Sequence, residues 1–108
     1  MIVYLLGKSL FEFRAIETYL DLGEQQSRAG VDVRIILLHG GVLAGRRKNR
    51  FEEHIRSVAK TGAKIYLRKE DLDARAIDRE SLSDFGTPID TTEIMKLAAE
   101  SDTLVSVI

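Results

Sequence analysis

Short apolar runs alternate with amphipathic segments along this chain, and this alternation constrains its fold more than any other feature. The first three runs cover residues 2–6, 33–38 and 63–67, and a fourth run, residues 103–108, closes the chain. Between the runs, apolar residues recur with the period of an α-helix. Strands separated by helices form parallel sheets through right-handed crossovers. The sequence therefore predicts an α/β fold, a three-layer sandwich with a four-stranded parallel sheet and helices on both faces.

Pairs of polar residues mark where the predicted helices begin. A capping residue followed three positions later by a glutamate satisfies free backbone N–H groups in the first helical turn. Glycines at positions 30 and 62 are expected to end the first two helices, while the charged segment 68–84 is expected to form a short helix and a loop. Pro88 also announces the last helix. The three cap pairs are Ser9 with Glu12, Asn49 with Glu52, and Asp90 with Glu93.

Length and charge limit the classes of function. The 108 residues fit one domain, residues 1–108, with a single core. Sixteen Lys and Arg against seventeen Asp and Glu give a net charge of -1, so no global charge attracts nucleic acid or a membrane surface. The longest apolar runs fall far short of the ~20 residues of a membrane span, and no signal peptide opens the chain. We expect a cytoplasmic protein that does not contact nucleic acid directly.

The ends of the strands carry the candidate binding residues. Ligands of open parallel sheets collect at the carboxyl ends of the strands, here residues 7–9, 39–48 and 68–71. Four cations crowd the predicted start of the second helix, where the helix dipole favours an anion. The alternative is a solvated loop whose charges repel one another. The candidate anion-binding residues are Lys8, Ser9, His39, Arg46, Arg47, Lys48 and Arg50.

Complete cofactor motifs are missing from the sequence. Gly7-Lys8-Ser9 imitates the tail of a phosphate-binding P-loop, but the residues before it form a strand instead of a glycine loop. The simpler interpretation is a helix cap beside a solvated lysine. Because the chain has no cysteine, disulfides and cysteine metal sites are excluded, and no other metal-ligand spacing is present. We expect neither a cofactor nor a metal.

Several segments resemble the DsrH/TusB branch of the DsrE/DsrF/DsrH sulfur-relay superfamily. The turn Lys8-Ser9-Leu10-Phe11 and the following Ile16-Glu17 are similar to the start of that branch. The run from Ile65 to Ala76 contains an E-D-L-x-A-R segment like the E-D-L-x-A-R-G of the family, which Ala76 breaks at its last place. The ending at residues 102–105 is also similar. The resemblance covers nearly the whole chain and implies a DsrEFH-like fold.

The resemblance also implies a function in sulfur transfer, and the absence of cysteine limits the role that this chain can have in it. Members of this branch that handle sulfur carry a cysteine on the first helix, and Tyr19 stands at that position here. Persulfide transfer requires a thiolate, which a tyrosine phenol cannot replace. We therefore expect a non-catalytic subunit of a sulfur-relay complex with cysteine-bearing DsrE-like and DsrF-like partners. The complex would serve 2-thiolation of the tRNA wobble uridine or sulfur oxidation.

Two other functions remain as hypotheses. The first is a stand-alone homo-oligomeric module that binds a small anion or nucleotide through residues 39–50. The second is an enzyme built on Lys8, His39 and Asp71 at the strand ends, although spacing alone indicates no pair of nucleophile and base. All three functional hypotheses predict association with other chains, because a small sheet leaves an open edge strand and little core.

Overall fold

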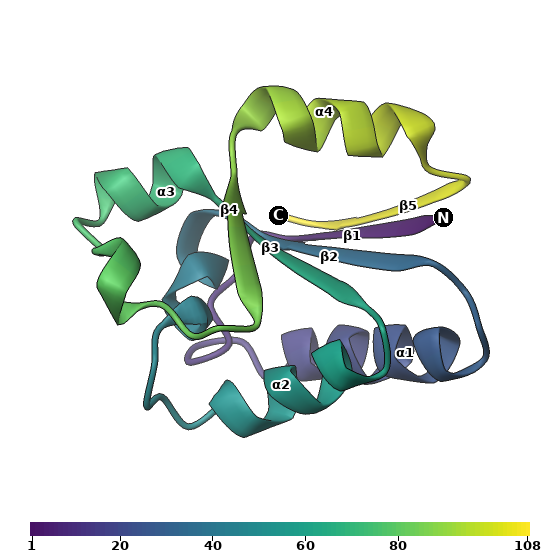
Figure 1. The fold of residues 1–108 in the computed structure, drawn as a ribbon, viewed down its shortest axis with the longest axis horizontal. Helices are drawn as coiled ribbons and strands as arrows, with labels where there is room; N and C mark the ends of the chain where they lie inside the picture. Colours follow the sequence, from purple (N-terminus) through teal and green to yellow (C-terminus); the bar gives the residue numbers. More distant parts are fainter.

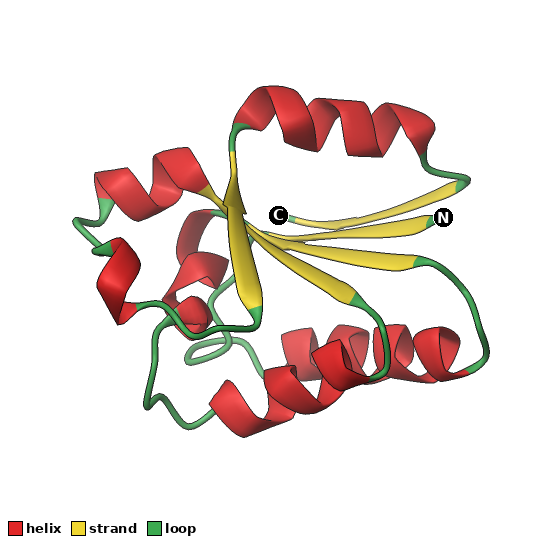
Figure 2. Ribbon diagram, viewed as in Figure 1, coloured by secondary structure: helices red, strands yellow, loops and turns green.

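The computed structural model describes residues 1–108, which form a five-stranded parallel sheet with the strand order β4-β3-β2-β1-β5 (Figures 1 and 2). The strands are β1 (Ile2–Leu6), β2 (Val33–Leu37), β3 (Lys64–Arg68), β4 (Gly86–Ile89) and β5 (Thr103–Val107). The α-helices are α1 (Ala15–Arg28), α2 (Glu52–Lys60), α3 (Lys69–Ala74) and α4 (Thr91–Glu100). Two 3-10 helices, η1 (His39–Gly45) and η2 (Arg79–Ser81), complete the elements.

The helices lie on both faces of the sheet, as the sequence predicts. Helices α1 and α2 lie side by side below the sheet in Figure 1, and α4 covers the opposite face. The chain adds β2, β3 and β4 in one direction from β1 and then returns across the sheet through α4 to place β5 beside β1. The general class, an α/β fold with a parallel sheet flanked by helices, is confirmed.

The predicted number of strands is wrong, because the sheet has five strands and not four. The missed strand is β4, which contains Pro88 and pairs only with β3. Proline has no N–H for a ladder and is tolerated at a sheet edge, so Pro88 lies in an edge strand instead of announcing a helix. The short sequence Gly-Thr-Pro-Ile carries no apolar run that would have revealed it.

The first predicted cap is also wrong, because α1 begins at Ala15. The Ser9 hydroxyl accepts a hydrogen bond from the Phe11 N–H at 3.2 Å, and the Ser9 carbonyl accepts one from the Phe13 N–H at 2.9 Å. These bonds close a turn between β1 and α1. Serine competes for local backbone donors in turns as readily as at helix starts, so the spacing from Ser9 to Glu12 cannot distinguish the two.

The other helix boundaries follow the sequence more closely. Asn49 lies three residues before the start of α2, so it is not the N-cap residue that the sequence predicts. Its side-chain oxygen Oδ1 accepts a hydrogen bond from the Phe51 N–H at 2.8 Å. Asp90 caps α4 as predicted, because its carboxylate accepts a hydrogen bond from the Glu93 N–H at 2.9 Å. Gly30 and Gly62 follow α1 and α2 with φ angles of 91° and 105°, the left-handed conformation typical of helix ends.

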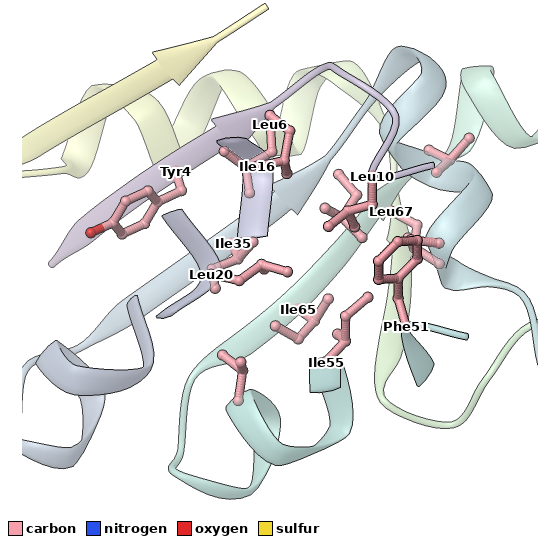
Figure 3. Close-up of a cluster of buried hydrophobic side chains, with 14 of the residues drawn as sticks. Tyr4, Leu6, Leu10, Ile16, Leu20, Ile35, Phe51, Ile55, Ile65 and Leu67 are labelled. Atoms are coloured by element: carbon pink, nitrogen blue, oxygen red, sulfur yellow. The ribbon is translucent and has the colours of Figure 1, made fainter. Parts of the chain in front are cut away.

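Two cores fill the space between the layers. The larger core joins the sheet to α1, α2, η1 and α3, and it includes Tyr4, Ile16, Ile35 and Ile55 (Figure 3). The smaller core lies under α4, around Ile36. The longest helix, α1, has 14 residues, and none of the helices combines the length and apolar character of a membrane span.

Candidate functional site

Three segments meet beyond the carboxyl ends of the strands, on the left of Figure 1. The turn after β1 contains Lys8 and Ser9, η1 follows β2 directly, and α3 follows β3. Helix η1 contacts both β3 and α3. The topology therefore brings the predicted strand-end residues to one side of the molecule.

The Asp71 carboxylate holds the start of η1 in place. It accepts a hydrogen bond from the backbone N–H of His39 at 2.7 Å, where the chain adopts a left-handed φ of 50°. Asp71 is 7% exposed, and it forms ion pairs with Arg68 at 3.3 Å and with Arg75 at 3.5 Å. Asp71 thus contacts the main chain of His39 and two guanidinium groups, and not the His39 imidazole.

The neighbouring Glu70 caps the helix on the other face of the sheet. Its carboxylate accepts hydrogen bonds from the Thr91 N–H at 3.1 Å and from the Thr91 hydroxyl at 2.9 Å. The bond from the backbone N–H is the main cause of a lowered pKa for Glu70. The Glu-Asp-Leu motif therefore has a structural role, because Glu70 fixes the start of α4 while Asp71 fixes the start of η1.

Lys8, His39 and Asp71, the three residues of the enzyme hypothesis, are not joined through their side chains. The Lys8 ammonium lies 5.0 Å from the centre of the Phe13 ring, which is a cation–π contact. The only hydrogen bond between any two of the three residues is the one from the His39 backbone to Asp71. The geometry shows no pairing of a nucleophile with a base.

Arg46 and Arg50 pack around a pair of aromatic rings. The Phe11 and Phe51 rings meet edge to face, with their centres 4.9 Å apart and an interplanar angle of 77°. The Arg50 guanidinium lies 5.5 Å from the Phe11 ring centre and 4.8 Å from that of Phe51, and the Arg46 guanidinium lies 5.9 Å from that of Phe11. These contacts orient the two cations near the starts of α1 and α2.

The remaining predicted residues do not join this group. Arg47 turns away and donates a hydrogen bond to the Leu82 carbonyl at 2.9 Å, beside a separate cleft that Arg56 and Asp84 also line. Lys48 is exposed, and Ser9 is buried, with its hydroxyl engaged by the backbone. The cluster of cations in the sequence thus separates into two groups in space.

A cleft of about 390 Å³ opens beside Arg50. Leu10 and Phe51 give it an apolar lining, whereas Arg14 and Arg50 contribute positive charge. Two further lining residues, Glu17 and His54, come from α1 and α2. The sequence does not mark Arg14 and His54 as binding residues, because each stands alone among unrelated neighbours in the chain. Each reaches the cleft only through the packing of α1 on α2.

Tyr19 lies on α1 and packs, half-buried, against the larger core. Its hydroxyl has no hydrogen-bond partner within the chain, in contrast to that of Tyr4, which bonds the Gln26 side chain at 2.5 Å. The side chain at this position therefore contributes by packing, and it offers no sulfur for transfer.

Comparisons with solved structures identify the fold. The ychN protein from E. coli superimposes with a TM-score of 0.83 at 20% identity, covering 98% of this chain and 97% of that one. The protein of unknown function MTH1491 from Methanobacterium thermoautotrophicum gives 0.76 at 11% identity, with 98% and 96% covered. The protein BT1422 from Bacteroides thetaiotaomicron, also of unknown function, gives 0.81 at 10% identity, with 98% and 93% covered.

The sequence itself identifies the family. Among curated proteins, none matches this chain. The model of the family described as DsrH like protein, however, matches residues 8–104, which include both the turn after β1 and the Glu-Asp-Leu motif. The chain therefore belongs to the DsrH-like protein family.

Proposed function

We propose that this chain is a non-catalytic subunit of a sulfur-relay complex, in which cysteine-bearing DsrE-like and DsrF-like subunits carry the sulfur. Membership of the DsrH-like family supports the sulfur-relay role. The absence of cysteine supports the non-catalytic one, because a persulfide forms only on a thiol. The partner's cysteine would then supply the chemistry, and this chain would supply a docking surface.

The open edge of the sheet at β5 is the observation that carries this proposal. Strand β5 pairs with β1 alone, so its outer edge presents unpaired backbone groups. Residues 103–108 include no charged residue and no proline, and the side chains of Leu104 and Ile108 are 45% and 56% exposed. Proteins protect edge strands that stay in solvent with charges, prolines or short length.

The opposite edge of the sheet, formed by β4, is protected against pairing, in contrast to the edge at β5. Strand β4 has four residues, and one of them is Pro88, so this edge is protected in the usual way. We therefore propose that the partner subunit binds at the edge of β5. The complex would act in 2-thiolation of the tRNA wobble uridine or in oxidation of reduced sulfur, the two tasks that the family resemblance implies.

Affinity purification of the tagged chain from its native host tests the proposal. Mass spectrometry of the retained proteins should find cysteine-bearing DsrE-like or DsrF-like chains with the wild type. Leu104→Asp places a charge on the unprotected edge and should abolish their recovery. Thr87→Asp makes a similar exposed change on β4 and should leave it unchanged. Recovery of the wild-type chain alone, or equal recovery with Leu104→Asp, would contradict the proposal.

The cleft beside Arg50 favours a second candidate function, a homo-oligomeric module that binds a small anion or nucleotide. Two guanidinium groups and an apolar lining suit an anion attached to a flat or apolar group. Phosphate, sulfate, thiosulfate and nucleotides should then raise the melting temperature of the wild type. Arg50→Gln should remove this stabilisation and Arg47→Gln should not, since Arg47 lines the other cleft. No stabilisation by any of these compounds would exclude this function.

A further inference from the structure

A mixed cluster of carboxylates and one imidazole lies between α1 and α2. Glu17, Asp21 and Glu24 occupy positions i, i+4 and i+7 of α1, which place them on one face of the helix. His54 faces them from α2. One ligand atom from each of Asp21, Glu24 and His54 lies within 4.8 Å of the others.

Both ring nitrogens of His54 face carboxylates. The Nε2 atom lies 2.8 Å from Asp21 Oδ1, and Nδ1 lies 3.5 Å from Glu17 Oε2. A neutral imidazole has a single N–H, so it can donate to only one of the two carboxylates. The other nitrogen then directs its lone pair at a negatively charged oxygen. A metal ion bound to that lone pair would remove this unfavourable contact.

The charges of the cluster favour binding of a divalent cation. Arg28 forms an ion pair with Glu24 at 2.8 Å and is the only Lys or Arg within ion-pair distance of the three carboxylates. Three carboxylates against one guanidinium leave two negative charges when His54 is neutral. Like charges one turn apart destabilise a helix, and a dication between them would remove this repulsion.

We propose that Asp21, Glu24 and His54 bind a zinc ion, with His54 coordinating through Nε2 and with Glu17 accepting the Nδ1 proton. Imidazole nitrogen and carboxylate oxygen are common zinc ligands, and three protein ligands leave one position open. A carboxylate behind the ligating histidine is the usual outer partner of such a site, since it fixes the tautomer that coordinates. Magnesium and calcium are disfavoured because they prefer oxygen ligands alone.

The side chains can reach zinc coordination without moving the helices. Asp21 is exposed and Glu24 is partly exposed, so rotations about their side-chain bonds can close the remaining distances. Glu24 is additionally approached by the Ser57 hydroxyl at 3.5 Å, which restricts it on the side of α2. The bound ion would cross-link α1 to α2 next to the cleft lined by Arg14 and Arg50. This site does not depend on partner binding at β5.

Calorimetric titration with zinc chloride at neutral pH tests the assignment. The wild-type chain should bind one zinc ion and melt at a higher temperature with zinc, while magnesium chloride should have neither effect. His54→Asn removes a ligand and should weaken zinc binding by more than roughly 100-fold. His39→Asn is the matched control, because it changes the other histidine of the chain and asparagine tolerates the left-handed conformation found there. It should bind zinc like the wild type.

Glu17→Gln distinguishes the proposed geometry from any surface histidine that binds zinc weakly. Glu17 is assigned no bond to the metal, yet its substitution should weaken binding by roughly 10-fold to 100-fold because the tautomer of His54 is no longer fixed. If His54→Asn fails to fold, Asp21→Asn removes a different ligand and should show the same loss. Absence of zinc binding by the wild type, or equal binding by it and the ligand variants, would overturn the proposal.

Discussion

The backbone N–H of His39 donates a 2.7 Å hydrogen bond to the Asp71 carboxylate, across 32 residues of sequence. This contact joins the segment after β2 to the helix after β3, at the side of the sheet where parallel folds bind ligands. It also fixes His39 in a left-handed conformation that non-glycine residues rarely adopt. His39 and Asp71, two of the three residues in the enzyme hypothesis, are therefore joined by a hydrogen bond that has a structural role.

Replacing Asp71 with alanine should destabilise the fold. The substitution leaves the His39 N–H without its partner, and an unsatisfied group of this kind costs about 1–3 kcal/mol. We expect a loss of about 2 kcal/mol in the free energy of unfolding by urea, within that range. Asp73→Ala on the same helix is the control, since Asp73 is exposed and pairs only with Arg79. Asp73→Ala should change the free energy of unfolding by less than about 0.5 kcal/mol. Equal losses in the two variants would contradict a structural role for the hydrogen bond between Asp71 and His39.

The contact between Glu70 and Thr91 should make stability depend on acid pH. The folded chain lowers the pKa of Glu70 below its ordinary value of 4.5, so its contribution is present above that value and is lost as pH falls through the folded pKa. Glu70→Gln should flatten this part of the stability profile. An NMR titration should give a pKa for Glu70 below 4.5 in the wild type; a value at or above it would contradict the contact.

Gly41 should tolerate no larger residue. A Cβ atom there would lie 2.5 Å from the Leu6 carbonyl oxygen, which is backbone and cannot move aside easily. We expect Gly41→Ala to lower the free energy of unfolding by about 1–3 kcal/mol, as overpacking does. At the adjacent Gly40, a Cβ would be 3.5 Å from Ser9, an ordinary contact. Gly40→Ala should therefore unfold at a higher urea concentration than Gly41→Ala, and the reverse order would be inconsistent with this packing.

Tyr19 should act through its ring and not through its hydroxyl. Since the hydroxyl has no partner in the chain, Tyr19→Phe should change the free energy of unfolding by less than about 0.5 kcal/mol. Tyr19→Ala removes the half-buried ring from the core and should cost about 2 kcal/mol, less than the 3–5 kcal/mol of a fully buried aromatic residue. Thermal and urea unfolding of both variants would measure this difference. A large loss in Tyr19→Phe would reveal a polar role.

Much of the architecture could be predicted because it depends on local patterns. Four of the five strands follow apolar runs, and the helix ends at Gly30 and Gly62 follow glycines that adopt positive φ. Asp90 caps α4 through a bond to a residue three positions away. The family could be identified for the same reason, since the Glu-Asp-Leu motif and the turn after β1 are contiguous in the sequence.

Local sequence patterns do not predict the structure where contacts with a distant segment of the chain determine it. Pro88 resembles a helix signal in isolation, and only pairing with β3 makes it part of a strand. Likewise, Ser9 can cap a helix or close a turn, and the 3-10 helix after β2 does not appear in the apolar pattern. The clustered cations after β2 divide between two clefts because Arg50 contacts aromatic rings while Arg47 bonds the Leu82 carbonyl.

The sequence by itself determined the class of fold, the family and the absence of a sulfur-carrying thiol. These follow from periodicity, contiguous motifs and composition, none of which requires knowledge of distant contacts. Only the tertiary structure decided that β5 has the unprotected edge and that His54 lies between Glu17 and Asp21. Docking edges and ligand clusters are assembled by the packing of separate elements. Residues more than 30 positions apart, such as Asp21 and His54, therefore act together without any shared signal in the sequence.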